Sequence, residues 1–330
     1  MIIHFKKGTD PARIDQLTNR LNGLLVHLAG DTRLITSSKI KSPPTEFADI
    51  IDQFFVMESD IQLAHKTYLN RRTIQLNDLT IGNGENTHLM AGPCSVESWE
   101  QIDQTAAFLK NLGIRTLRAG CFKPRTSPYT FQGLGEAGLE MLVKIREKHG
   151  LNIITEVKDS THVDVVLEHT DIVQIGTKAM YDTSILKTCG KSSKPVLLKR
   201  GFGTTLQEFV QAAEFILSQG NTQVILCERG IRTFENKTRF TLDLTGVAYL
   251  KEFTNLPVVV DPSHAMGYRY GVPDLTRAAV AMGIDGLLIE THPAPEQALS
   301  DAAQQLNFDE FETMYHSLEP VARAVGRTIV

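Results

Sequence analysis

The chain has 330 residues, 42% of them apolar, and a formal net charge of −4. That length allows one large domain with a smaller one beside it, and a pI near 6.2 gives no basic field for binding nucleic acid. No apolar run approaches the roughly 18 residues that span a bilayer, and the N-terminus lacks the pattern of a secretory signal. The four widely spaced cysteines predict reduced thiols in a cytoplasmic protein rather than a disulfide framework.

The first part of the chain, residues 1–72, predicts a small α+β domain. Apolar runs and turn signals predict strands at residues 2–7, 24–30, 32–38 and 54–59, and helices at residues 11–22 and 43–54. The resulting βαββαβ order fits a ferredoxin-like domain. Residues 73–86 are rich in turn formers, and we expect them to form a connector that carries a short hairpin.

Residues 87–330 change to an alternation of short aliphatic runs and amphipathic stretches. Strands are expected at residues 88–94, 115–122, 152–157, 171–177, 195–201, 223–230, 257–264 and 286–292. Eight strands with helical sequence between them match a (β/α)8 barrel. The structural alternative is a doubly wound open sheet, which usually has fewer strands and a Gly-rich phosphate turn after the first one. No such turn follows residues 88–94, so the sequence favours the barrel.

Ionisable residues recur where these strands end, which is the end of a barrel that carries the chemistry. The cations there are Arg118, Lys123, Arg125, Lys178, Lys199 and Arg229. Six positive side chains around one opening would repel each other unless an anion of several charges were bound. A solvated rim with scattered ion pairs would explain any single lysine, but explains the whole set poorly. The sequence therefore predicts one or two phosphorylated substrates.

A second group of rim residues could hold a metal ion. Cys94, His264 and Glu290 come from the first, seventh and eighth strands, which are neighbours in a closed barrel, and Asp301 follows in the next loop. Taken alone, each has an ordinary structural explanation. Together, a thiolate, an imidazole and two carboxylates suit one divalent ion of the Mn, Fe, Co or Zn class better than Mg²⁺ or Ca²⁺. The sequence does not decide among these metals.

The loop after the second strand, residues 120–133, is long and stiffened by Pro124 and Pro128. It carries three hydrogen-bonding residues in a row, Arg125, Thr126 and Ser127. Such a loop suits ligand binding, although a merely rigid surface loop is the alternative.

The motifs AGPCSVES, LRAGCFKPRTSPYTFQG, PVLLKRG, DPSHAMG and IETHPAPEQALSD resemble those of type I 3-deoxy-D-arabino-heptulosonate 7-phosphate (DAHP) synthases. The chain is more closely similar to the microbial subgroup with an N-terminal ferredoxin-like domain. The resemblance implies that phosphoenolpyruvate condenses with D-erythrose 4-phosphate and releases phosphate, in the first step of the shikimate pathway towards aromatic amino acids. It also implies a homotetramer that is inhibited by Tyr or Phe through the N-terminal domains.

The resemblance assigns roles that agree with the rim analysis. The metal ligands are Cys94, His264, Glu290 and Asp301, the phosphoenolpyruvate residues are Arg118, Lys123, Lys178, Lys199 and Arg229, and the erythrose 4-phosphate residues are Arg125, Thr126 and Asp261, with Ser127 beside them. Lys178 stands where the family usually has an arginine, so altered affinity for phosphoenolpyruvate is expected. Glu156 or Lys199 is expected to position or deprotonate the attacking water.

Two other functions are compatible with parts of this pattern. The nearest is 3-deoxy-manno-octulosonate 8-phosphate synthase, but that family typically has another loop motif where this chain has Lys123 to Ser127 and usually lacks an N-terminal extension. The other is a non-catalytic barrel that acts as a sensor. Such a barrel would be expected to have lost a metal ligand or the KPRTS motif, and this chain retains both.

Overall fold

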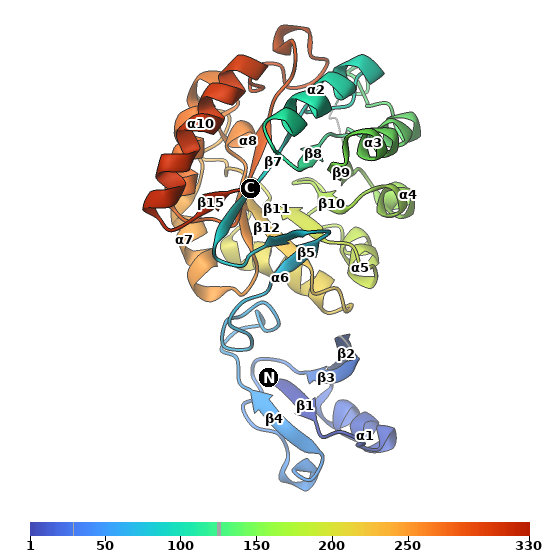
Figure 1. Cartoon of the computed structure of the whole chain (residues 1–330). Coiled ribbons are helices and arrows are strands. Elements are labelled where there is room, and N and C mark those ends of the chain that lie inside the picture. Colours follow the sequence, from blue (N-terminus) through green and yellow to red (C-terminus); the bar gives the residue numbers. More distant parts are fainter. Residues whose placement is uncertain (29, 124–126) are drawn as a thin grey trace.

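The computed structural model describes residues 1–28, 30–123 and 127–330. The N-terminal part is a four-stranded antiparallel sheet of order β2-β3-β1-β4. Its elements are β1 (Ile2–Phe5), α1 (Pro11–Leu21), β2 (Leu24–Leu28), β3 (Asp31–Ile35), a 3₁₀ turn η1 (Thr45–Phe47) and β4 (Ile51–Phe55). Figure 1 shows this sheet as a separate small lobe beside the main body.

The helix expected over residues 43–54 is wrong. The segment forms η1 and then the first part of β4. This strand starts at Ile51, whereas the sequence predicted a strand over residues 54–59. Phe47, Ile50 and Ile51 have helical spacing, but all three are buried in one cluster with Leu17. The turn and the strand bury the same apolar groups, and β4 also gains a ladder with β1. Tertiary pairing therefore overrides the local pattern.

The connector forms a hairpin that closes the base of the main body. Its strands are β5 (Ile74–Leu76) and β6 (Leu79–Ile81). The four apolar residues that end these strands, Ile74, Leu76, Leu79 and Ile81, are buried against side chains of the barrel interior such as Met90. Asn77, in the turn, donates from Nδ2 to Asn152 Oδ1 of a barrel strand at 2.5 Å. The expected hairpin is thus part of the barrel's hydrophobic core.

The eight expected parallel strands form a closed barrel, and the prediction of a (β/α)8 barrel is confirmed. The strands are β7 (Asn86–Gly92), β8 (Thr116–Arg118), β9 (Asn152–Val157), β10 (Ile172–Ile175), β11 (Val196–Lys199), β12 (Val224–Glu228), β13 (Val258–Val260) and β14 (Gly286–Glu290). They pair in chain order, and β14 pairs with β7 to close the ring. β15 (Thr328–Ile329) adds to β7 outside it.

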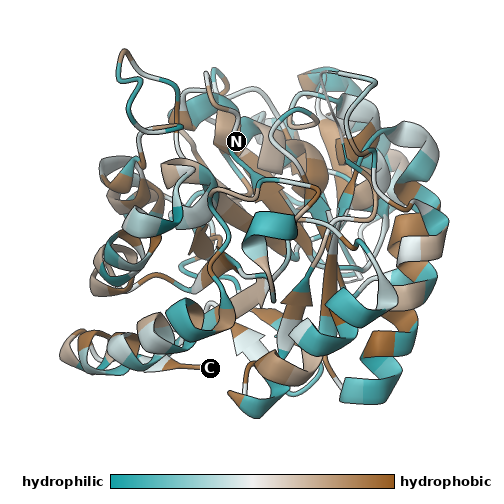
Figure 2. Ribbon diagram, turned by 90° about the horizontal axis from the view of Figure 1, so that it is seen from above, coloured by the Kyte–Doolittle hydropathy of each residue, from teal (hydrophilic) through white to brown (hydrophobic). Residues whose placement is uncertain are grey.

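Helices surround the barrel and bury their apolar faces on the strands (Figure 2). They are α2 (Trp99–Asn111), α3 (Glu136–His149), α4 (Val163–His169), α5 (Thr183–Lys191), α6 (Leu206–Leu217), α7 (Leu244–Phe253), α8 (Pro262–Met266), α9 (Val272–Ala281) and α10 (Phe308–Ala324). Short 3₁₀ turns lie at η2 (Ser160–His162), η3 (Arg269–Gly271) and η4 (Pro295–Gln297). In the described residues no helix is long and apolar enough to cross a membrane.

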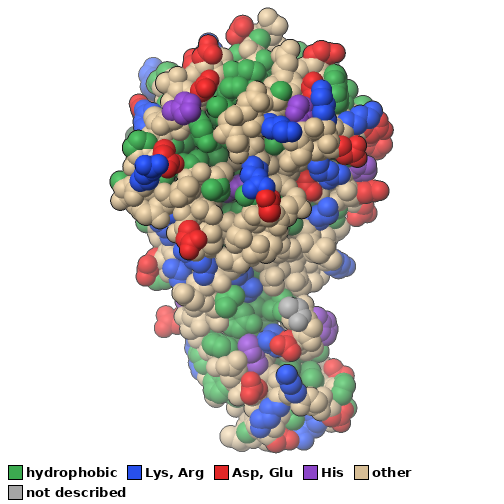
Figure 3. Space-filling view, in the orientation of Figure 1, with side chains coloured by type: hydrophobic (Ala, Val, Ile, Leu, Met, Phe, Trp, Pro, Cys, Tyr) green, Lys and Arg blue, Asp and Glu red, His purple; other side chains and the backbone are tan. Residues whose placement is uncertain are grey.

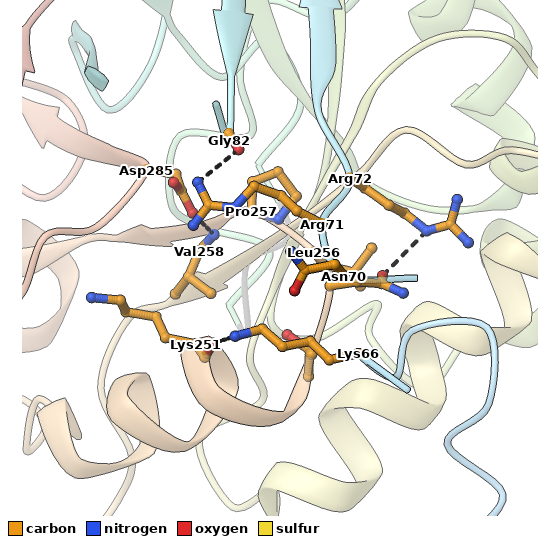
Figure 4. Close-up of a pocket in the computed structure, with 12 residues that line it drawn as sticks. Lys66, Asn70, Arg71, Arg72, Gly82, Lys251, Leu256, Pro257, Val258 and Asp285 are labelled. Atoms are coloured by element: carbon orange, nitrogen blue, oxygen red, sulfur yellow. Dashed lines mark hydrogen bonds between the residues drawn. The ribbon is translucent and has the colours of Figure 1, made fainter. Parts of the chain in front are cut away.

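Basic side chains of residues 66–72, just before the connector, fasten this part of the chain to the base of the barrel (Figure 4). Lys66 Nζ donates to Lys251 O at 2.5 Å, and Arg71 donates to Gly82 O at 3.1 Å. Arg72 donates from Nε to Asn255 Oδ1 at 3.2 Å. Glu214 of α6 accepts from the backbone N–H groups of three consecutive residues that precede the connector, Gln62 to Ala64. Residues 61–64 are therefore bound to the barrel, although they precede the hairpin.

Charges on the face of Figure 1 are mixed. Figure 3 shows Lys and Arg side chains interspersed with Asp and Glu over both lobes. This face has no block of a single sign that would suit a nucleic acid backbone.

Candidate active site

The cluster of Cys94, His264, Glu290 and Asp301 forms at the C-terminal rim of the barrel. Cys94 follows β7, His264 lies in α8 just after β13, and Glu290 is the last residue of β14. Asp301 lies in the loop beyond, in the left-handed backbone region at φ 48°. One ligand atom from each residue lies within 4.8 Å of the ligand atoms of the other three. The sequence-predicted set is therefore brought together at one point.

The electrostatics of this cluster favour a cation at its centre. Burial raises the pKa of the Cys94 thiol to about 12, and the charge of Glu290 adds to this effect. Burial also acts to raise the pKa of Glu290, but His264 and Arg118 outweigh it and the net shift is downward. The carboxylate of Asp301 opposes that ionisation. Two like charges and a thiol held this close would be relieved by a divalent ion, so the residues fit a mixed S, N, O metal site.

Asp261 contacts the cluster through His264. Its side chain is fully buried, and its Oδ2 lies 2.8 Å from His264 Nδ1 and 2.6 Å from Lys199 Nζ. Burial acts to raise the pKa of Asp261, but its interactions with His264 and with the Lys199 ammonium group outweigh it and hold the pKa well below its usual value. A carboxylate facing Nδ1 leaves Nε2 of His264 directed at the cluster, as in many metal sites.

Beside the cluster lies a solvent-open cleft with about 780 Å³ of empty volume. Its charged lining is mostly basic and comprises Lys123, Lys178, Lys199, Arg229 and Arg239, with the carboxylates Glu156 and Asp301. The excess of cations suits substrates that carry several negative charges.

Arg229 is the side chain most clearly available to an anion. It is 3% exposed, and its Nε and Nη1 have no hydrogen-bond partner among the residues that the structure describes. Its Nη2 donates to His264 O at 3.3 Å. Burial lowers the pKa of its guanidinium, which an arginine tolerates while staying charged. A buried cation with two unused donors is costly unless a ligand completes it.

The remaining predicted residues divide between the cleft and its surroundings. Lys123, Lys178 and Glu156 line the cleft, and Glu156 Oε2 accepts from Gln174 Nε2 at 2.7 Å. Arg118 does not line it, because its Nη1 donates to Glu290 Oε1 at 2.5 Å below the cluster. Ser127 accepts from Tyr129 N within its own loop. Arg125 and Thr126 lie outside the described residues.

Two residues that strand-end reasoning did not find complete the site. Arg239, in the loop after β12, donates from Nη1 to Gln304 Oε1 at 2.7 Å and lies 3.4 Å from Asp301 Oδ2. Gln304 in turn donates to Glu290 Oε2 at 2.6 Å. Both residues lie well inside loops, so the rule that barrel chemistry sits at strand ends does not identify them.

Comparison with known proteins gives the family and supports the fold. The family model described as DAHP synthetase I family matches residues 60–326. A phospho-2-dehydro-3-deoxyheptonate aldolase of Thermotoga maritima is 43% identical over 303 residues, which is 92% of this chain and 88% of that protein. The crystal structure of a protein of that name from the same organism has a TM-score of 0.81 and 39% identity, and the match covers 100% of this chain and 99% of that one.

The octulosonate enzymes match at lower identity and over a smaller share of the chain. A 2-dehydro-3-deoxyphosphooctonate aldolase of Francisella tularensis is 31% identical over 276 residues, which is 77% of this chain and 99% of that protein. From the family match, the Thermotoga maritima relatives and the shared barrel, we conclude that the chain is an enzyme of the DAHP synthetase I family.

Proposed function

We propose that the enzyme condenses phosphoenolpyruvate with D-erythrose 4-phosphate to give 3-deoxy-D-arabino-heptulosonate 7-phosphate and inorganic phosphate. The observation that carries the proposal is the basic cleft, in which the buried Arg229 keeps two unused donors beside the four-residue metal cluster. The names of the Thermotoga maritima relatives support the same reaction.

Basic side chains would bind and align both substrates. Lys123, Lys178, Lys199 and Arg229 surround the space where the phosphate and carboxylate of phosphoenolpyruvate would lie. Holding both reactants in one cleft turns a two-body encounter into a local event. A divalent ion on Cys94, His264, Glu290 and Asp301 would act as a Lewis acid towards the aldehyde oxygen of the aldose.

The chemistry then follows from the substrates. C3 of phosphoenolpyruvate attacks the aldehyde carbon, and water adds at C2, where positive charge develops. Glu156 positions that water or accepts its proton, and Lys199, whose ammonium group is paired with Asp261, can position the water as a donor. The resulting hemiketal phosphate loses phosphate by cleavage of the C2–O bond. Phosphate should therefore carry away the bridging oxygen of phosphoenolpyruvate, and retention of an oxygen-18 label in the sugar would contradict this order of steps.

The choice of aldose is tested by a direct competition. The octulosonate relatives are about 30% identical to this chain, so arabinose 5-phosphate is the alternative acceptor. The purified enzyme should release phosphate with erythrose 4-phosphate and far more slowly with arabinose 5-phosphate. A preference for arabinose 5-phosphate would assign the octulosonate reaction instead. The absence of turnover with either aldose, with metal present, would favour a sensor.

Metal dependence is tested by removal and return of the ion. Treatment with a chelator should abolish phosphate release, and Mn²⁺ or Co²⁺ should restore it. The variant Cys94→Ala should bind these ions more weakly by calorimetry, because it removes the thiolate ligand. Full activity after exhaustive chelation would contradict a metal requirement.

We further propose that residues 1–56 form a ferredoxin-like domain without its second helix, and that this domain mediates inhibition by Tyr or Phe in a homotetramer. Its strand order β2-β3-β1-β4 and the single helix α1 support that description. The match to the Thermotoga maritima structure, which covers the whole chain, also supports it. Light scattering would give the oligomeric state, and titration with each amino acid would identify the effector.

A further inference from the structure

The structure raises the question of what orients Arg229. Among the described residues no carboxylate lies within ion-pair distance of its guanidinium, and its one hydrogen bond goes to His264 O. The neighbouring strand end shows the usual solution. Arg200, after β11, pairs with Glu228 at 2.9 Å and with Asp243 at 2.8 Å. Arg200 is thereby neutralised, and the same arrangement at Arg229 would compete with an anionic ligand.

An aromatic ring takes the place of a carboxylate at Arg229. The Arg229 guanidinium lies over the Phe240 ring, 4.2 Å from its centroid. Phe240 stacks on Phe202, with the ring centroids 5.5 Å apart and the planes 14° from parallel. Arg232 lies over Phe202 at 5.2 Å. A continuous stack thus runs from the cleft to the surface through Arg229, Phe240, Phe202 and Arg232.

The backbone fixes Phe240 in this stack. Its N–H donates to Ala265 O at 2.9 Å, in the short helix α8 that also carries His264. Ile231 and Thr241 pair across the base of the loop. Gly230 leaves the space for the ring, because a Cβ there would lie 2.7 Å from Phe240 Cβ, and its φ of 92° also favours glycine. The ring is therefore anchored to the element that bears a predicted metal ligand.

We infer that Phe240 is a positioning residue, which holds the Arg229 guanidinium in place for the phosphate of the substrate without neutralising its charge. The face of a ring attracts a cation but uses none of its N–H donors. A carboxylate in the same place would occupy two of those donors and cancel the charge. The inference rests on the proposed function in taking phosphoenolpyruvate as the bound anion.

The test replaces the ring and measures anion binding directly. In Phe240→Leu, we expect the dissociation constant for inorganic phosphate and the KM for phosphoenolpyruvate to rise about 5- to 30-fold. We expect kcat and the KM for the aldose to change much less, because Phe240 lies behind Arg229 and is not among the described residues that line the cleft. Phe240→Tyr keeps the aromatic face and should restore both values. Phe202→Leu removes the second ring of the stack, which also lines the cleft, and should give a smaller rise.

The same loop offers a matched control. Phe234 is 99% exposed, and no ring or cation contact involves it among the described residues, so Phe234→Leu should leave phosphate binding unchanged. Melting temperatures of all variants separate loss of folding from loss of positioning. If Phe240→Leu binds phosphate as tightly as Phe234→Leu, or if Phe240→Tyr fails to rescue a folded protein, the inference is wrong.

The outcomes also separate this inference from the proposed function. Normal turnover in the wild type with unchanged phosphate affinity in Phe240→Leu would overturn the positioning role alone. No turnover in the wild type, with phosphate affinity lost in Phe240→Leu and kept in Phe240→Tyr, would overturn the proposed reaction and leave the stack intact. A wild type that binds neither phosphate nor phosphoenolpyruvate would overturn both.

Discussion

The side chain of Asp261 makes three contacts at once, one with a backbone N–H group and two with side-chain nitrogens. Its Oδ1 accepts from His264 N at 2.9 Å and caps α8, while Oδ2 faces Lys199 Nζ and His264 Nδ1. The first contact needs only an acceptor, which an asparagine also supplies. The other two need the negative charge, so the substitution to asparagine separates capping from electrostatic orientation.

We predict that Asp261→Asn weakens metal binding about 10- to 100-fold, because the imidazole of His264 loses the carboxylate that fixes it. Calorimetry with Co²⁺ or Mn²⁺ measures this without an activity assay. Asp243→Asn is the control, since Asp243 also caps a helix at this rim but pairs with Arg200 instead. Equal metal affinity in the two variants would show that Asp261 does not orient His264.

Gly176 protects the position of Glu156. A Cβ on Gly176 would lie 1.9 Å from Glu156 Oε1, so Gly176→Ala must displace that carboxylate. If Glu156 positions the attacking water, a displacement of about 1 Å should lower kcat about 100-fold with little change in stability. Steady-state kinetics measure this. Gly203→Ala, also at this rim but with open space around it, should leave kcat unchanged. Equal kinetics in the Gly176→Ala and Gly203→Ala variants would exclude the role of Glu156.

At the level of elements, α6 holds residues 62–64, which precede the connector, through the buried carboxyl group of Glu214. Burial raises the pKa of Glu214 to about 7, although three backbone N–H groups and Arg72 oppose the shift. A folded-state pKa above the unfolded value of 4.5 means that the folded protein binds the extra proton. The contribution of Glu214 to stability is then fully present below about pH 4.5 and is lost as the pH rises through 7.

We therefore predict that Glu214→Gln flattens the pH dependence of stability between pH 5 and 8. One pKa unit corresponds to about 1.4 kcal/mol, so the group's contribution across this window is on the order of 3 kcal/mol. Urea unfolding of wild type and variant at several pH values measures the difference. Parallel curves for the two proteins would show that the pKa of Glu214 does not differ between the folded and unfolded states.

At the level of the whole molecule, the boundary between the N-terminal lobe and the barrel lies before the connector. Met57, Ile61 and Leu63 pack in the main hydrophobic cluster of the barrel, where Ile2, Val26 and Leu28 of the N-terminal sheet meet them, and the hairpin β5–β6 closes the base of the barrel. Removing the hairpin would take away its four buried aliphatic side chains and uncover the barrel side chains that they pack against, such as Met90. The structure thus dictates where a truncation can be made.

We predict that residues 57–330 alone fold and keep turnover, but lose any inhibition by Tyr or Phe. Residues 83–330 should instead be less stable by several kcal/mol, because burial of each hairpin side chain contributes about 1.5–3 kcal/mol. Kinetics with each amino acid and urea unfolding measure the two effects. Inhibition that persists in residues 57–330 would place the effector site in the barrel.

The sequence by itself determined the barrel and the composition of its rim. Parallel strands buried on both faces read as aliphatic runs, and their C-terminal ends must meet at one edge, so Cys94, His264 and Glu290 could be grouped before any coordinates were known. These inferences need only local patterns and the closure of a ring.

The tertiary structure alone decided the features that depend on contacts between distant segments. The expected helix over residues 43–54 became η1 and β4, because pairing with β1 buried the same side chains. Arg118 donates to Glu290, and Arg239, in the middle of a loop, forms an ion pair with Asp301. The contact of Phe240 with Arg229 likewise joins a residue in a loop to a residue at a strand end. No periodicity encodes such contacts, because loop geometry, and not spacing along the chain, sets where these side chains lie.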